Sequence, residues 1–148
     1  MIDTALGLCT AAAFDGERIV AVRSEAMARG HQERLGGMVR DVAAEAGGFA
    51  GVARIGVTVG PGSFTGLRVG LAFAQGLGTA LGVPVVGLST LDALAASIPS
   101  VGAPQAGAVA ALIDARRGQV YARFWRGGAP TGEAEVLTLE DAAARIVD

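Results

Sequence analysis

The residues best suited to chemistry surround a glycine-rich turn, Gly60-Pro61-Gly62-Ser63, which lies between an apolar predicted strand and a predicted helix. A strand that leads through glycines into a helix directs backbone N–H groups and the positive end of the helix dipole toward an anion. Asp3 and Thr4, at the end of the first predicted strand, add a carboxylate and a hydroxyl that suit a metal-bound phosphate. Asp3, Thr4, Gly60, Gly62 and Ser63 therefore form a candidate nucleotide or phosphate site.

A purely structural role explains the same residues. Ser63 is a suitable cap for the helix that follows, and the glycines permit a tight turn and close packing. The spacing of Gly60, Gly62 and Gly66 is one residue longer than the dinucleotide-binding fingerprint requires. The sequence contains no Lys, which excludes the phosphate-loop motif. Phosphate binding and packing are both open interpretations of this turn.

Other catalytic or metal-binding chemistry lacks the necessary residues. The sequence has one His and one Cys, so it offers neither a His/Cys set for zinc nor a nucleophile with a spare His partner. We therefore expect no metal site built from His and Cys, and no catalytic arrangement of these types. Cys9 is expected in the core, and His31 at the start of an amphipathic helix, facing solvent or an interface.

Composition limits the compartment and the partners. The 148 residues are 51% hydrophobic, which supports a real core, and no apolar run reaches the ~20 residues that span a bilayer. With one Cys and no signal-peptide pattern, we expect a cytoplasmic protein that does not bind membranes. A net charge of −2 lacks the basic excess of a nucleic-acid-binding protein, so any RNA contact must be local or shared.

The best local RNA-like patch lies on a predicted hairpin at residues 108–125 and on the residue that follows it. Arginine and aromatic residues alternate there, and guanidinium groups contact phosphate while aromatic rings stack on bases. Strand alternation divides these aromatics between the two faces, so half of them are candidates for the core instead. The residues concerned are Arg116, Arg117, Tyr121, Arg123, Phe124, Trp125 and Arg126.

Hydrophobic periodicity and turn signals predict an α/β fold. The first hundred residues are predicted to fold in the order β-β-β-α-β-α-β-α, with helices at residues 31–46 and 64–81. A Pro/Gly-rich stretch separates them from a second hairpin, a strand and a short helix. We expect an N-terminal lobe at residues 1–104 and a partial second lobe at residues 105–148.

The helix at residues 64–81 carries a stripe almost without side chains. Gly66, Gly70, Ala74, Gly78 and Gly82 recur at every fourth position and so lie on nearly one face. Glycine in a helix lowers its stability by about 0.5–1 kcal/mol relative to alanine. We therefore expect another backbone to pack closely against this stripe. Part of this stripe is predicted to face another subunit, although it is also suited to the chain's own sheet.

Five segments of the chain together resemble one known family. They are residues 2–5 (Ile-Asp-Thr-Ala), 29–35 (Arg-Gly-His-Gln-Glu-Arg-Leu), 60–70 (Gly-Pro-Gly-Ser-Phe-Thr-Gly-Leu-Arg-Val-Gly), 86–95 and 114–116 (Asp-Ala-Arg). As far as about Trp125 the chain is similar to the TsaB (YeaZ) family, the bacterial dimerisation subunits for tRNA threonylcarbamoyladenosine synthesis. The resemblance implies a ribonuclease H-like lobe of the actin/Hsp70 ATPase type.

The resemblance also implies a non-catalytic role. Family members pair with the paralogue TsaD, which transfers the threonylcarbamoyl group to N6 of adenosine 37 in tRNAs reading ANN codons. The ATPase TsaE joins them, so ATP is used by the complex and no cofactor is expected on this subunit. We expect tRNA contact through the complex, and a homodimer when TsaD is absent.

In the family the two helices form the dimer interface, which places the expected interface on two groups of residues. On the first helix they are His31, Leu35, Met38 and Val39. On the second they are Phe64, Leu67, Arg68, Leu71 and Gln75, with Gly66, Gly70 and Ala74 of the stripe. The alternative function is an actin-like ATPase or phosphotransferase that binds Mg-nucleotide at Asp3, Thr4 and the turn from Gly60 to Ser63.

Overall fold

A computed structural model describes residues 1–98 and 107–147 of the chain. They form two compact units, Met1–Leu88 and Ser89–Asp148. The boundary expected after residue 104 lies outside the described residues. Helix α3 (Thr90–Ala96) groups with the second unit because it contacts strands β6 and β7 of that unit.

The first unit is built on a mixed sheet. Among the described residues the sheet has five strands in the order β3-β2-β1-β4-β5. Strands β1 (Ile2–Asp3), β2 (Leu8–Asp15) and β3 (Arg18–Ala26) pair antiparallel, while β1 pairs parallel with β4 (Ile55–Gly60). Strand β5 (Val85–Ser89) is the far edge. The predicted order of three strands followed by alternating helices and strands is confirmed.

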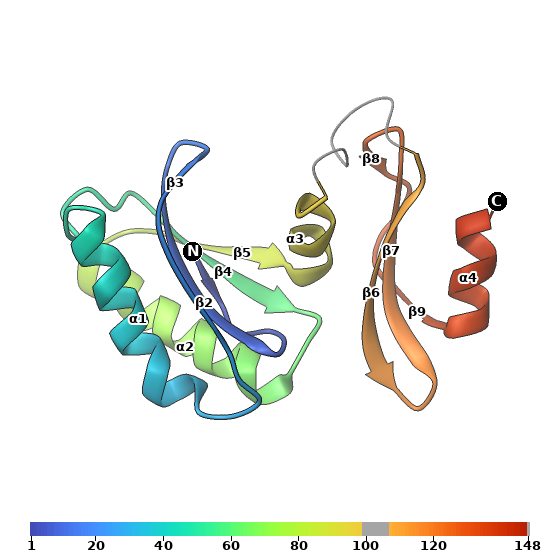
Figure 1. Ribbon diagram of the computed structural model, residues 1–148, viewed down its shortest axis with the longest axis horizontal. Coiled ribbons are helices and arrows are strands. Elements are labelled where there is room, and N and C mark those ends of the chain that lie inside the picture. Colours follow the sequence, from blue (N-terminus) through green and yellow to red (C-terminus); the bar gives the residue numbers. More distant parts are fainter. Residues whose placement is uncertain (99–106, 148) are drawn as a thin grey trace. The chain divides into compact units, whose positions relative to one another are not determined.

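Two long helices cover one face of this sheet (Figure 1). Helix α1 (His31–Glu45) contacts β2 and β3, and α2 (Phe64–Leu81) contacts β1 and β4. Side chains from both helices enter one core: the larger ones from α1 are Leu35, Met38, Val39 and Val42, and they meet Ile2, Ile55 and Val57 of the sheet. Since α1 and α2 share this core, they lie side by side on the sheet and each turns its opposite face to solvent.

Ion pairs connect α1 to the edge strand β3. Arg23 pairs with Glu45, and Arg34 pairs with Glu25. All four side chains are exposed, so solvent screens both pairs and each contributes little to stability, although both pairs join α1 to β3.

The second unit is a smaller sheet with helices attached. Strands β6 (Val109–Arg116) and β7 (Gln119–Arg126) form the predicted hairpin, and β8 (Ala129–Pro130) and β9 (Glu135–Thr138) both pair with β7. Arg123 of β7 binds Asp92 of α3 through one guanidinium nitrogen, at 2.6 and 2.8 Å from the two carboxylate oxygens. The predicted final helix is confirmed as α4 (Leu139–Val147). It contacts β7 and β9.

Candidate partner surface and the glycine turn

The small-residue stripe of α2 faces the chain's own sheet. Gly66, Gly70, Ala74 and Gly78 are all buried. A Cβ on Gly66 would lie 2.0 Å from the carbonyl oxygen of Thr4, and one on Gly70 would lie 2.4 Å from the Thr4 hydroxyl. The assignment of Gly66, Gly70 and Ala74 to a partner interface is therefore wrong: the close approach that the glycines permit is to strands β1 and β4.

The predicted interface residues of α1 also face inward. His31, Leu35, Met38 and Val39 are each at most 8% exposed. They follow the i, i+3, i+4 spacing of the apolar stripe, and that stripe packs on β2 and β3. The assignment of His31, Met38 and Val39 to a contact surface is therefore corrected, because the chain's own sheet buries the apolar face of α1. Leu35 packs in the same core and also lines the groove described below.

The rest of the predicted interface, on α2, is accessible. Phe64 is 68% exposed and Leu71 36% exposed, and Arg68 and Gln75 are exposed as well. The guanidinium carbon of Arg68 lies 3.7 Å from the centroid of the Phe64 ring. Leu67 is half-buried, beside the position that a Cβ on Gly60 would take. These residues place a large aromatic ring, a cation and an aliphatic side chain on the solvent side of α2.

An apolar groove of about 380 Å³ runs between α1 and α2 next to this surface. Leu35, Val69, Ala72 and Phe73 line it, with the polar side chains of Gln32 and Arg68. Gly36 on α1 contributes no side chain and lies against Phe73, where a Cβ would be 3.6 Å from the ring. Four of the lining residues, Gln32, Val69, Ala72 and Phe73, were missed from the sequence. Positions of α2 outside the glycine stripe could have indicated the last three. The side-chain-poor surface open to solvent is therefore at Ala72 and at Gly76, whose Cβ would meet nothing within 4 Å.

The residues of the candidate nucleotide site lie close together, but their polar atoms form hydrogen bonds within the chain. The buried Thr4 hydroxyl donates to the Gly66 carbonyl at 2.7 Å, and one Asp3 carboxylate oxygen accepts from the Ala5 amide at 2.9 Å and the Thr58 hydroxyl at 2.8 Å. Ser63 caps α2 by accepting from the Gly66 amide. These contacts account for Asp3, Thr4 and Ser63 by packing and capping.

The glycines of the same turn are explained by backbone contact. Gly60 has φ +115°, a conformation that side chains disfavour, and a Cβ on Gly62 would lie 2.3 Å from the carbonyl oxygen of Ala5. The Ser63 amide donates to that same oxygen at 2.6 Å. The turn therefore attaches the start of α2 to the segment after β1, and the capping interpretation fits every contact that these residues make.

The described part of the chain offers neither a reactive thiol nor a metal-binding group. Cys9 is buried, and burial, together with the charge of Glu25, raises the pKa of its thiol, which disfavours the reactive thiolate. Among residues 1–98 and 107–147, no three His, Cys, Asp or Glu side chains gather as a metal-binding group. In the same residues no helix has both the length and the apolar character to cross a bilayer.

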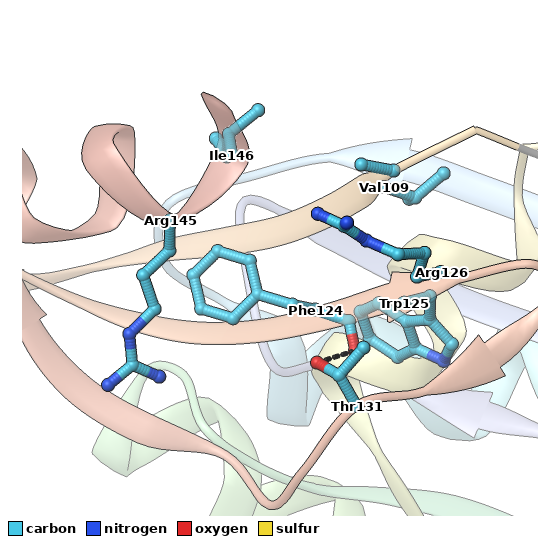
Figure 2. A pocket seen from close by; sticks show the side chains of 8 residues that line it. Val109, Phe124, Trp125, Arg126, Thr131, Arg145 and Ile146 are labelled. Atoms are coloured by element: carbon cyan, nitrogen blue, oxygen red, sulfur yellow. Dashed lines mark hydrogen bonds between the residues drawn. The ribbon is translucent and has the colours of Figure 1, made fainter. Parts of the chain in front are cut away.

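The Arg-aromatic patch on β7 is divided between two faces. Trp125 is buried, and Arg123, on the same side of the strand, is 17% exposed and engaged with Asp92. Phe124, on the other side, lies 5.9 Å from the guanidinium of Arg145 on α4 and lines a small cavity of about 80 Å³ (Figure 2). Arg116 and Arg117, with φ of 71° and 55°, are exposed at the hairpin turn. No continuous base-stacking surface results along β7.

Comparison with known proteins assigns the family. The chain matches, over residues 20–146, the family model described as TsaD: tRNA N6-adenosine threonylcarbamoyltransferase. The chain belongs to this TsaD family. It is 37% identical over 122 residues to the tRNA threonylcarbamoyladenosine biosynthesis protein TsaB of Escherichia coli (strain K12), covering 81% of this chain and 51% of the relative. Within the family it is one of the TsaB (YeaZ) proteins.

A further curated relative and a solved structure agree with this assignment. An uncharacterized protein of Mycobacterium leprae (strain TN) is 40% identical over 132 residues, which cover 86% of this chain and 35% of the relative. The structure of YeaZ from Pseudomonas aeruginosa matches with a TM-score of 0.77 and 35% identity, covering 92% of this chain and 65% of that one. The chain thus spans 35% and 51% of the length of these two curated relatives.

Proposed function

We propose that this chain is a non-catalytic subunit that binds a TsaD-type protein and supports N6-threonylcarbamoylation of adenosine 37 in tRNAs reading ANN codons. The curated relative from Escherichia coli, named for tRNA threonylcarbamoyladenosine biosynthesis, supports the pathway. In this proposal the first unit is a ribonuclease H-like lobe of the actin/Hsp70 type, and the second unit is part of the other lobe.

The observation that carries the proposal is the solvent face of α2. Phe64 and Leu71 expose large apolar surfaces beside an open apolar groove, with Arg68 between them. Exposed apolar patches next to a groove are typical of protein–protein contact sites. Aromatic and Arg side chains are also the types most enriched among the residues that dominate binding energy. Phe64, Leu67, Arg68, Leu71 and Gln75 thus stay in the proposed interface, and the buried residues of α1 support it from below.

The wider assembly follows from the same role. TsaE joins the complex and ATP is used there, while this subunit binds no cofactor of its own. Without TsaD, the exposed α2 surface favours a homodimer. The tRNA is bound through the complex, which operates in the cytoplasm.

Co-purification tests the proposal. Phe64→Ser should lower the recovery of the TsaD-type protein about tenfold or more, because an interface aromatic contributes roughly 2 kcal/mol or more when it is a hot spot. Phe14→Ser is the matched control, since Phe14, near the end of β2, is 51% exposed and does not line the groove. Equal recovery with both variants would reject the interface.

A further inference from the structure

The lining and the volume of the open groove between α1 and α2 indicate what kind of group it can bind. Its walls are apolar at Leu35, Val69, Ala72 and Phe73. A volume of about 380 Å³ is at the low end of the range for binding pockets, about 300–1,000 Å³. Side chains of a partner helix fit such a space, and a groove bordered by two helices, α1 and α2, suits the helix-in-groove mode of recognition.

Arg68 sits on the rim of this groove in a preorganised state. Its guanidinium carbon is 3.7 Å from the Phe64 ring centroid, so the ring holds one face of the guanidinium group by a cation–π contact. Stacking uses the face of the group and leaves its N–H donors, which lie in the plane, directed outward. A carboxylate approaching edge-on can accept two of these hydrogen bonds at once.

The part of the chain that the structure describes does not supply that carboxylate. Among the described residues, no ion pair includes Arg68. Helix α2 contains no Asp or Glu, and Arg68 is its one charged residue. On α1 the acids have other contacts: Glu33 accepts from Gln32, Asp41 lies beside Arg40, and Glu45 pairs with Arg23.

From this charge pattern we propose that the groove binds a helix of the partner that carries an apolar side chain and, one turn away, an Asp or Glu. The apolar side chain enters the groove beside Ala72 and the carboxylate binds the guanidinium of Arg68. The spacing follows from α2 itself, because Arg68 and Ala72 are four residues apart and so lie one turn apart on one face. Arg68 then selects the partner by charge. This inference rests on the proposed function and specifies the chemistry of the same surface.

The test measures the affinity of the full chain for the purified TsaD-type protein as a function of salt concentration. Arg68→Gln should weaken binding about tenfold at low salt, in line with the loss of a hydrogen bond between charged groups. The difference from the unmodified chain should shrink as salt rises, because screening weakens the charge contact that Gln lacks. Arg68→Lys should recover part of the affinity, since it keeps the charge but not the planar fork.

Arg18→Gln is the control. It makes the same change of charge at an exposed residue of β3, and it should leave both the affinity and the salt dependence unchanged. Circular dichroism and thermal unfolding of each variant establish that the fold is intact.

Three results would overturn the inference. If Arg68→Gln binds within twofold of the unmodified chain with the same salt dependence while Phe64→Ser abolishes binding, the partner contributes no carboxylate and the proposed function stands. If Arg68→Gln prevents self-association of the chain but not binding of the TsaD-type protein, the groove accepts a second copy instead. If the unmodified chain binds no TsaD-type protein at any salt concentration, the proposed function fails as well.

Discussion

The hydroxyl of Thr4 donates a hydrogen bond to the carbonyl of Gly66 across 2.7 Å, joining the end of β1 to the first turn of α2. Thr4 is completely buried, and Gly66 has no side chain to separate the two segments. This contact lies on the face of α2 that meets the sheet. Phe64, Arg68 and Leu71 lie on the exposed side of the same helix.

Alanine at the buried glycines should destabilise the fold. A Cβ at residue 66 or 70 would meet Thr4 at 2.0 or 2.4 Å, so Gly66→Ala and Gly70→Ala should each lower the free energy of unfolding by about 2 kcal/mol or more. Urea denaturation followed by circular dichroism measures this change.

Gly76→Ala is the matched control on the same helix. A Cβ there meets nothing within 4 Å, so this variant should be more stable by about 0.5–1 kcal/mol because alanine favours the helix. Equal stability of all three variants would show that the stripe is not packed on the sheet.

Removing the Thr4 hydroxyl should weaken the same junction. Thr4→Val keeps the shape of the side chain but deletes its hydrogen bond to Gly66, and should reduce the free energy of unfolding by about 1–2 kcal/mol. Thr10→Val, which deletes an exposed contact with Ser24, should change it by less than about 0.5 kcal/mol. A larger loss at Thr10 than at Thr4 would contradict this account of the junction.

The sequence predicts the elements well because their signals are local. The 3.6-residue period of α1 and the Ser63 cap both arise within a few residues, and both are confirmed. The choice of buried face on α2 was predicted only in part. Helix α2 has an apolar face with Phe64 and Leu71 and a small-residue face with Gly66 and Gly70. Each of these two faces is suited to packing on a sheet. What decides is the distance between α2 and β1, which depends on the non-local contact with Thr4.

The candidate sites illustrate the same limit. Asp3, Thr4 and Ser63, which the sequence analysis grouped as a candidate site, lie close together: Thr4 and Ser63 both bind the backbone of Gly66, and Asp3 precedes Thr4. Whether a ligand or the chain itself satisfies their polar atoms depends on partners such as Ala5 and Thr58, and residue types do not reveal these contacts. The groove was missed for a related reason, since it needs two helices to be placed side by side.

The Glu25–Arg34 ion pair should give stability a specific pH dependence. The hydrogen bond from Arg34 holds the pKa of the Glu25 carboxyl below its usual value. A carboxyl group whose pKa is lower in the folded state stabilises the fold above the unfolded-state pKa, and this contribution is lost as pH falls through the folded-state pKa. Glu25→Gln should therefore lower the thermal midpoint at neutral pH, and the difference from the unmodified chain should vanish in acid.

Thermal unfolding at about pH 7 and about pH 3 checks this direction. Glu17→Gln, the same change of charge at the exposed turn between β2 and β3, is the control. A difference between Glu25→Gln and the unmodified chain that grows on acidification would contradict the sign.

The Arg123–Asp92 contact should couple α3 to β7. Arg123 is largely buried, and one of its nitrogens is 2.6 and 2.8 Å from the two Asp92 oxygens. A double-mutant cycle with Arg123→Met and Asp92→Asn should give a coupling free energy of about 1 kcal/mol, because Asp92 is partly exposed and solvent weakens the pair. A coupling indistinguishable from zero would mean that apolar contacts alone hold α3 on the second unit.

Titration of the purified TsaD-type protein with Ala72→Gln and Ala80→Gln tests the docking surface most directly. Both are exposed alanines of α2, and glutamine is a good helix former, so both variants should fold. Residue 72 lines the groove and residue 80 does not. The account predicts that Ala72→Gln weakens binding about tenfold or more while Ala80→Gln binds as the unmodified chain does, since only the former fills the occupied space. Undiminished binding by Ala72→Gln would show that the partner does not use the groove between α1 and α2.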